Sequence, residues 1–554
     1  MFAGLQPAQG TTPTAPAGIA SAHPLATEAG MEILAAGGNA FDAAVAVTAA
    51  LAVVEPTGSG LGGGGFWLLH QADKNRDIML DGREAAPLAA KANMFLDAKG
   101  NVIPGLSIDG PLAAAIPGVP AAIAHLATHY GRLPLAASLA PAIRYAKKGF
   151  AVSEHYRLLA GFRLDALRSS PAARDIFLQQ NEIPDVGFII KQADLAKTLE
   201  NIAHNGAAGF YAGETADRLI NGVRESKGIW TKEDFKAYHV VERIPIVGEF
   251  RGLRITSAAP PSAGGIALVT ALNILSGYDL DKATPALRTH LVVEAMRRAY
   301  RDRAVYLGDP DFVDIPVQRL IHPLYADGLR ASLRPDRATP SDMLPGSPPA
   351  PAGSDTTHFS IIDGSGNRVA ATLSINAPFG SGFVPPGTGV LLNDEMDDFS
   401  AKPNTPNFYG LVGQEANAIA PGKRPLSSMT PTFLENDERI AVLGTPGGSR
   451  IISMVLLAAL DFASGADATH IVSQKRFHHQ FLPDALEHEP GALDDQTRNT
   501  LQTLGHTLKE SRRLYGNMQL LIWNKKTQTL SGASDPRSNG KIDLNIHPTS
   551  PSLP

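Results

Sequence analysis

Two short runs of alternating apolar and polar residues lie beyond the midpoint of the chain, on either side of a turn cluster. In residues 358–363 the apolar residues Phe359 and Ile361 fall on odd positions, and in residues 368–376 so do Val369, Ala371, Leu373 and Ile375. This leaves hydroxyl and amide side chains, among them Ser374 and Asn376, on the opposite face. The Gly-Ser-Gly-Asn cluster between the runs predicts a β-hairpin. If its loop has an odd number of residues, the even positions of both strands share one side, so Thr356 lies across from Ser374 and Asn376.

For a lone hairpin, the simplest interpretation is a surface sheet whose hydroxyls face water. The segment Asn393–Ser400 weakens that interpretation, because it brings Glu395, Asp397 and Asp398 close behind the hairpin. Seen alone, such a run is more often a solvated turn or a calcium loop. The regular alternation of oxygen ligands that a calcium loop needs is missing here.

Helical patterns dominate the start of the chain. Residues 24–36 carry apolar positions at helical spacing, and Asn39 with Asp42 is typical of a helix N-terminus. The apolar run that follows is too short and interrupted to span a bilayer, so it predicts a buried helix. Residues 58–65 then place six glycines before a strand-like run. A phosphate loop needs a lysine, and a dinucleotide fingerprint runs from strand into helix. The glycines therefore predict close backbone packing beneath a core strand.

The middle of the chain, from about residue 111 to residue 330, is mostly helical in pattern. Residues 135–146 and 195–204 are clear examples. Two stretches interrupt the helical pattern and predict strands, residues 232–250 and residues 253–260.

Several segments predict loops. Residues 334–354 form a linker rich in Pro, Ser and Ala, and residues 401–418 predict either a lid or a disordered loop. In residues 444–450 (GTPGGSR) the glycines precede an apolar helix, where backbone N–H groups are free to face an anion. His478 and His479 are adjacent on one element and cannot easily share a ligand, so we expect structural roles for both.

Composition narrows the classes of function. The 554 residues are 44% hydrophobic and 19% charged, as in a globular protein with a large core. The net charge of −5 gives no reason to expect nucleic acid or an anionic membrane surface as a partner. The chain has no cysteine, which excludes disulfides, thiolate metal sites and a cysteine nucleophile. Residues 1–23 predict a flexible leader and show no signal peptide.

Four motifs together resemble one known family. They are DTTHFS (355–360), ATLSIN (371–376), LLNDEMDDFS (391–400) and KRPLSSM (423–429). In this order and spacing they resemble the gamma-glutamyltransferases (glutathione hydrolases), which are N-terminal-nucleophile hydrolases, and the resemblance extends from about Pro24 to Arg537. It implies an α+β fold, a four-layer αββα sandwich in which two stacked sheets lie between helical layers. Two chains of one precursor would form it jointly, a large subunit (24–355) and a small subunit (356–554).

The resemblance also implies how the reaction is catalysed. Thr356 would be the nucleophile, released as a new N-terminus by self-cleavage after Asp355. A threonine hydroxyl needs a base, and the freed α-amine, with a pKa of roughly 7.7–8.0, is largely available near neutrality. Ser374 stands where the family has a threonine that hydrogen-bonds the nucleophile. The backbone N–H groups of Gly447 and Gly448 match the oxyanion hole.

A γ-glutamyl group ends in an ammonium and a carboxylate, so its pocket needs an anionic and a cationic side. The residues that match the family's ammonium site are Asn376, Glu395 and Asp398. Those that match its carboxylate site are Arg83, Ser427 and Ser428, and Tyr409 matches a tyrosine of its lid. The arginine suits its task because its planar fork pairs bidentately with a carboxylate. No metal or organic cofactor is implied.

The implied activity is γ-glutamyl amide cleavage, with glutathione as substrate and water, amino acids or peptides as acceptors. The family is typically periplasmic or secreted. Two alternatives stay open: a cephalosporin (glutaryl) acylase of the same family, and a catalytically silent binding protein that remains uncut. No membrane partner is expected.

Overall fold

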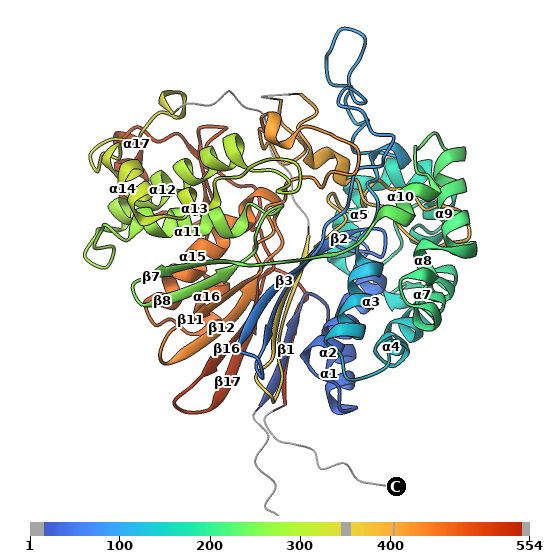
Figure 1. The fold of residues 1–554 in the computed structure, drawn as a ribbon. Coiled ribbons are helices and arrows are strands. Elements are labelled where there is room, and N and C mark those ends of the chain that lie inside the picture. Colours follow the sequence, from blue (N-terminus) through green and yellow to red (C-terminus); the bar gives the residue numbers. More distant parts are fainter. Residues whose placement is uncertain (1–15, 345–355, 403–404, 546–554) are drawn as a thin grey trace, which may run out of the picture.

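Two stacked β-sheets form the centre of the molecule (Figure 1). The computed structural model describes residues 16–344, 356–402 and 405–545. The first sheet has the order β18-β1-β9-β10-β2-β3-β6. Its strands are β1 (Ala17–Ser21), β2 (Gly64–Gln71), β3 (Arg76–Gly82), β6 (Val241–Arg243), β9 (Thr357–Ile362), β10 (Arg368–Ser374) and β18 (Lys541–Asn545).

The second sheet has the order β17-β16-β12-β11-β8-β7. Its strands are β7 (Ile246–Phe250), β8 (Leu253–Ser257), β11 (Thr432–Glu435), β12 (Arg439–Gly444), β16 (Gln519–Asn524) and β17 (Thr529–Ser534). The short strands β4 (Phe150–Ala151), β5 (Ile189–Ile190), β13 (Phe477–His478), β14 (Leu486–His488) and β15 (Leu508–Glu510) lie outside both sheets. Residues before and after Thr356 therefore contribute strands to both sheets.

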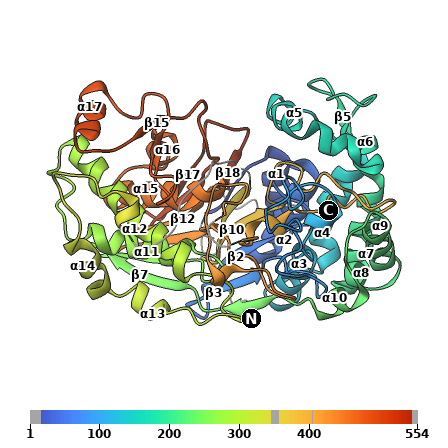
Figure 2. The same cartoon turned by 90° about the horizontal axis from the view of Figure 1, so that it is seen from above.

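Helices cover the outer face of each sheet, as Figures 1 and 2 show from two directions. Beside the first sheet lie α1 (Pro24–Ala35), α2 (Ala40–Val54), α3 (Val119–His129), α4 (Leu135–Lys148), α5 (Glu154–Ser169), α6 (Pro171–Phe177), α7 (Ala193–Asn205), α8 (Ala208–Tyr211), α9 (Gly213–Glu225) and α10 (Lys232–Ala237). Beside the second lie α11 (Gly264–Leu275), α12 (Pro285–Tyr306), α13 (Val317–Leu320), α14 (Pro323–Ala331), α15 (Ile451–Ala463), α16 (Ala468–Ser473) and α17 (Asp495–Thr503). The predicted four-layer αββα sandwich is confirmed.

The hairpin of β9 and β10 has the predicted parity. Thr357 pairs with Leu373, and continuing this antiparallel register by one residue sets Thr356 across from Ser374. The odd-numbered side chains join the core beneath α1–α9, and the even-numbered ones face the second sheet. There the Nδ1 of His358 lies 2.9 Å from the hydroxyl oxygen of Thr372. The polar face is thus buried between two sheets and does not lie in water.

The first helical layer holds the hairpin in place. Asn39 caps α2 as predicted and forms a capping box with Asp42, and every residue of α2 is buried. The glycine-rich segment packs as expected. A Cβ on Gly63 would come 2.0 Å from the carbonyl oxygen of Ser374, and one on Gly62 would come 2.1 Å from that of Leu391. Side chains there would push β10 and the acidic segment out of place.

Three predictions need correction. Residues 17–21 of the predicted leader form β1, which pairs with β9 and β18; residues 1–15 lie outside the described residues. Within the predicted strand region 232–250, Lys232–Ala237 is a helix, because Thr231 and Asp234 form a capping box. The described part of the predicted flexible linker, residues 334–344, is packed against the rest of the chain at Ser341, which is buried and donates its hydroxyl to the Phe481 carbonyl. Residues 345–354 lie outside the described part of the chain.

No helix within the described ranges combines the length and apolarity needed to cross a bilayer.

Candidate active site

Thr356 lies directly before β9 and lines a small cavity. The residue is 7% exposed. Its hydroxyl oxygen is 3.4 Å from the backbone nitrogen of Gly447, whose N–H points at it. Gly58 packs against the other side, since a Cβ there would come 3.1 Å from the Thr356 carbonyl oxygen. The threonine is therefore held between the glycine-rich loop and the GTPGGSR turn.

The GTPGGSR turn links β12 to α15 and needs its two glycines. Gly447 has φ +144° and Gly448 has φ +55°. Added Cβ atoms would come 2.5 Å from Met454 Cε and 2.4 Å from the Tyr409 ring. The turn continues as a 3₁₀ helix, Gly448–Arg450, directly before α15, so free backbone N–H groups point out at its start. Such donors suit a developing oxyanion on a carbonyl attacked by Thr356.

Ser374 lies across from Thr356, but no hydrogen bond joins these two described residues. The Ser374 hydroxyl oxygen instead accepts the backbone N–H of Asn376 at 2.7 Å. Asn376 has φ +73°, a conformation that asparagine tolerates, and its amide donates to the Asp394 carbonyl at 3.1 Å. The Ser374 O–H proton donates to none of the described residues, so it remains able to serve Thr356.

Arg83 is completely buried and surrounded by acidic groups. Its Nη1 lies 2.7 Å from a Glu395 carboxylate oxygen and 3.4 Å from one of Glu84, and its Nη2 pairs with Asp398. Its Nε donates to the Pro425 carbonyl at 3.1 Å. The anionic and cationic sides that the sequence predicts are therefore in direct contact.

The charges of this cluster shift one another's pKa values. Burial alone would lower the pKa of Arg83, but the carboxylates of Glu395, Asp398 and Glu84 raise it above its usual value. Burial raises the pKa of Glu395 well above its ordinary range in spite of Arg83, and raises that of Glu84 to about 7. The cluster thus holds protons near neutrality.

Four side chains on the cavity wall have buried polar atoms without a hydrogen-bond partner among the described residues, namely Arg303, Glu395, Ser428 and Ser449. Both carboxylate oxygens of Glu395 lack a hydrogen bond, despite the close approach of Arg83, and so does the Ser428 hydroxyl. Ser427 is better fixed. Its backbone N–H donates to the Pro261 carbonyl at 2.8 Å, and its hydroxyl accepts the N–H of Met429 at 3.1 Å. Unsatisfied buried groups of opposite kinds are what a site for a zwitterion requires.

Tyr409 closes one side of the cavity from within the predicted lid. Its O–H donates to the Asn376 carbonyl at 2.7 Å. The lid is tied to the acidic segment, because the Asn407 amide donates to Asp398 at 3.1 Å and the Phe408 N–H donates to Asp397 at 2.7 Å. The segment around Tyr409 is therefore fixed against the cavity wall, and residues 403–404 lie outside the described residues.

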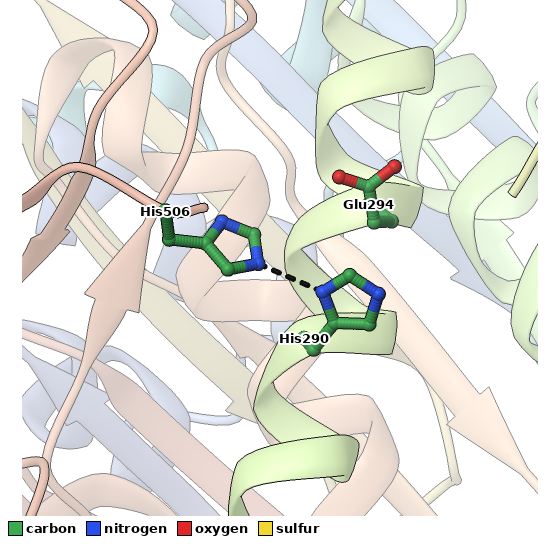
Figure 3. A group of neighbouring side chains, drawn as sticks. All are labelled: His290, Glu294 and His506. Carbon is green, nitrogen blue, oxygen red and sulfur yellow. Dashed lines mark hydrogen bonds between the residues drawn. The ribbon is translucent and has the colours of Figure 1, made fainter. Parts of the chain in front are cut away.

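One group within the described ranges has ligand atoms close enough together for a metal ion, namely His290, Glu294 and His506 (Figure 3). The ring nitrogens of His290 and the carboxylate of Glu294 are already engaged, although the Nδ1 of His506 is buried without a partner among the described residues. The His290 Nε2–H faces the Arg334 carbonyl at 2.8 Å, so its Nδ1 accepts from His506 Nε2, also at 2.8 Å. The Glu294 carboxylate is shared by two arginines and a backbone N–H. This cluster anchors residues 334–339 and fits a structural role.

The histidines expected to be structural are buried and hydrogen-bonded. His478 lies 2.5 Å from the Ser453 hydroxyl, and His479 lies 3.2 Å from Asp484. Burial lowers the pKa of His478 to about 3 and that of His479 to about 4, so both rings are neutral.

The predicted site residues come together. Ten of them line the cavity: Arg83, Thr356, Ser374, Asn376, Glu395, Asp398, Tyr409, Ser427, Ser428 and Gly448. Gly447 contacts Thr356 directly. Sequence reasoning missed Arg303, which also lines the cavity from α12. The only signal was an arginine-rich run, which does not reveal which arginine faces the site.

The fold and the site together define the class of protein. A four-layer αββα sandwich with a buried threonine at the start of a central strand, beside backbone donors, is the arrangement of the N-terminal-nucleophile hydrolases. A family model described as gamma-glutamyltranspeptidase matches residues 26–544. The chain belongs to the gamma-glutamyltranspeptidase family and is an enzyme of that family.

Similar proteins agree with this assignment. A glutathione hydrolase proenzyme of Pseudomonas sp. (strain A14) is 43% identical over 539 residues, covering 95% of this chain and 93% of the relative. Another, of Escherichia coli (strain K12), is 42% identical over 530 residues, covering 94% and 90%. The crystal structure of cephalosporin acylase from Bacillus halodurans superposes with a TM-score of 0.84 at 29% identity, over 98% of this chain and 99% of that one. Helicobacter pylori gamma-glutamyltranspeptidase gives 0.57 at 41% identity, over 61% and 96%.

Proposed function

We propose that the protein cleaves the γ-glutamyl amide bond of glutathione and related compounds and passes the glutamyl group to water or to an amino acid or peptide. The observation that carries the proposal is the position of Thr356. Its hydroxyl meets a backbone N–H donor in a cavity that also contains the unsatisfied groups of Glu395 and Ser428. An enzyme that binds the α-amino and α-carboxyl groups of a substrate and attacks its carbonyl carbon needs a nucleophile, an oxyanion donor and polar binding groups in one cavity.

The reaction begins with self-cleavage, which is part of the proposal. The Thr356 hydroxyl attacks the Asp355 carbonyl carbon, the peptide bond shifts to an ester, and water hydrolyses the ester. The products are chains of 355 and 199 residues. Asp355 itself lies outside the described residues. The relatives that are named proenzymes support this step.

In the mature protein the free α-amine of Thr356 takes the proton from its hydroxyl. The oxygen attacks the γ-carbonyl carbon, and the Gly447 N–H stabilises the developing oxyanion, with Gly448 as the second predicted donor. The C–N bond breaks, the amine leaves with the proton, and a γ-glutamyl ester of Thr356 remains. Water or an acceptor amine then attacks that ester, which releases the glutamyl group and restores the hydroxyl.

The pocket favours glutamyl over glutaryl substrates. A glutaryl group lacks the ammonium, so it would bring no donor to the Glu395 carboxylate beyond the contact that Arg83 already makes. The relatives at 42–43% identity are named glutathione hydrolases, whereas the acylase structure is 29% identical. Export to the periplasm or the medium belongs to the same proposal and rests on the family resemblance.

The test compares wild type with Thr356→Ala and Thr356→Ser. We expect two bands on a denaturing gel for wild type and one uncut, inactive chain for Thr356→Ala. Thr356→Ser keeps the hydroxyl and should still be cut. Activity is measured with L-γ-glutamyl-p-nitroanilide and with glutaryl-p-nitroanilide, and we expect the first to be preferred. Two bands from Thr356→Ala would refute the assigned cut, and an uncut, inactive wild type would indicate a silent binding protein.

A further inference from the structure

Arg303 differs from the other arginines of its helix. On the same stretch of α12, Arg297 and Arg298 pair with Glu294, and Arg301 pairs with Asp302. Arg303 is 5% exposed and lines the cavity beside Thr356. No residue in the described ranges forms a hydrogen bond or ion pair with its guanidinium, and its Nε is buried without a partner.

A buried cation without an acceptor is costly. Arginines in protein interiors are paired or hydrogen-bonded, because an uncompensated charge loses its hydration and gains nothing in return. Burial lowers the pKa of Arg303 to about 10, although the charge of Asp398 favours the cation, so the side chain is still charged near neutrality. A group of this kind suits a ligand that brings the missing negative charge.

Arg83 alone offers little room for a ligand carboxylate. Its three nitrogens already face the Pro425 carbonyl and the carboxylates of Glu84, Glu395 and Asp398. Ser428, by contrast, has an unused hydroxyl on the wall of the same cavity. Arg303 and Ser428 thus provide donors that the described residues leave unsatisfied, and Glu395 provides acceptors.

We propose that Arg303 binds the α-carboxylate of the γ-glutamyl substrate, as a second cation beside Arg83 and together with the Ser428 hydroxyl. The inference rests on the proposed function and names one more residue for recognition of the substrate. Glu395 and Asp398 then remain for the ammonium. Only substrates with a carboxylate at this end gain from Arg303.

The experiment pairs Arg303→Met with two anilides that differ in one group. L-γ-Glutamyl-p-nitroanilide has the α-carboxylate, and 4-aminobutyryl-p-nitroanilide lacks it but keeps the ammonium. We expect kcat/KM for the glutamyl anilide to fall at least about thirtyfold, mostly through KM, because a buried charge partner is lost. The value for the aminobutyryl anilide should stay within about twofold of wild type. Arg303→Lys should recover part of the loss, since it keeps the charge but not the fork.

Arg288→Met is the matched control. It makes the same substitution near the start of α12, on a partly exposed arginine that lies 3.5 Å from Asp461 and does not line the cavity. Its kinetics should equal those of wild type. The melting temperature of Arg303→Met should be equal to or above that of wild type, because the change removes an unpaired buried charge.

The outcomes separate the two proposals. If wild type does not cleave the glutamyl anilide, the proposed function fails. If wild type is active and Arg303→Met loses nothing, or loses both anilides in equal proportion, the role of Arg303 is refuted while the function stands. A sharply lower melting temperature with equal losses would assign Arg303 a structural role. A selective loss on the glutamyl anilide, at an unchanged melting temperature, supports carboxylate binding.

Discussion

Replacing Arg83 by methionine removes the cation around which three buried carboxylates gather, those of Glu84, Glu395 and Asp398. Breaking a buried charge pair by truncating one partner costs about 3–5 kcal/mol, because the remaining charge stays buried. Part of this cost can be avoided by proton uptake. The pKa of Glu84 is already about 7 and that of Glu395 is well raised, and both rise further without the arginine.

The penalty of Arg83→Met therefore depends on pH. The folded variant binds protons that the unfolded chain releases above its ordinary carboxyl pKa, so the loss of stability grows as pH rises. We expect a loss of about 3 kcal/mol or more at pH 8 and a clearly smaller loss at pH 6. Urea unfolding at both pH values measures it. The double variant Arg83→Met/Glu395→Gln should recover part of the loss at pH 8, since one of the stranded charges is gone.

Two results would refute this reasoning. A variant as stable as wild type at pH 8 would mean that Arg83 does not hold the carboxylates together. An equal loss at pH 6 and pH 8 would mean that the carboxylates do not take up protons. Activity should be lost in either case if Arg83 also serves the substrate carboxylate, so stability is the readout that tests the cluster.

Two further predictions concern the hairpin. Ser374→Ala should slow both self-cleavage and amide hydrolysis, because it removes the hydroxyl opposite Thr356, and Ser374→Thr should match or exceed wild type. Gel time courses measure self-cleavage and initial rates measure hydrolysis. A fully active alanine variant would contradict the role of the Ser374 hydroxyl. Burial raises the pKa of Glu55 from 4.5 to about 7, although its carboxylate accepts the Thr357 hydroxyl at 2.5 Å. Because the folded pKa is the higher one, the unfolding free energy should fall as pH rises from about 4.5 to about 7. Glu55→Gln should flatten that fall by up to about 3 kcal/mol, and equal slopes for both proteins would contradict it.

Local signals in the sequence were sufficient for several elements. Asn39 and Asp42 marked the start of α2, because a capping box involves only neighbouring residues. The parity of the β9–β10 hairpin followed from its two-residue period and set Thr356 across from Ser374. The same kind of signal, Thr231 with Asp234, was present before α10 and was outweighed by the strand-like residues that follow.

Long-range partners could not be predicted. Strand β1 is short and weakly patterned, and it becomes a strand because β9 and β18 pair with its two edges. The family motifs grouped the site residues, but not the ion pairs that join Arg83 to Glu395 and Asp398 across some 300 positions of sequence. Arg303 was missed for the same reason, since the pattern of its helix does not show which arginine meets the cavity.

The alternation of early and late strands in the first sheet has a consequence for assembly. Strand β1, from before Thr356, lies between β18 and β9, which come after it. Strand β10, from after Thr356, pairs with β2, which comes before it. Backbone hydrogen bonds therefore join segments from both sides of Thr356 in one sheet. A cut before Thr356 would leave two polypeptides that cannot separate unless the sheet unravels. The intact precursor folds as one molecule, at a rate independent of concentration. Once cut, the unfolded halves must find each other, so refolding becomes a bimolecular event that dilution suppresses. Self-cleavage would thus make folding effectively irreversible at low concentration. The lifetime of the cut protein would then be set by the rate at which its paired strands unfold.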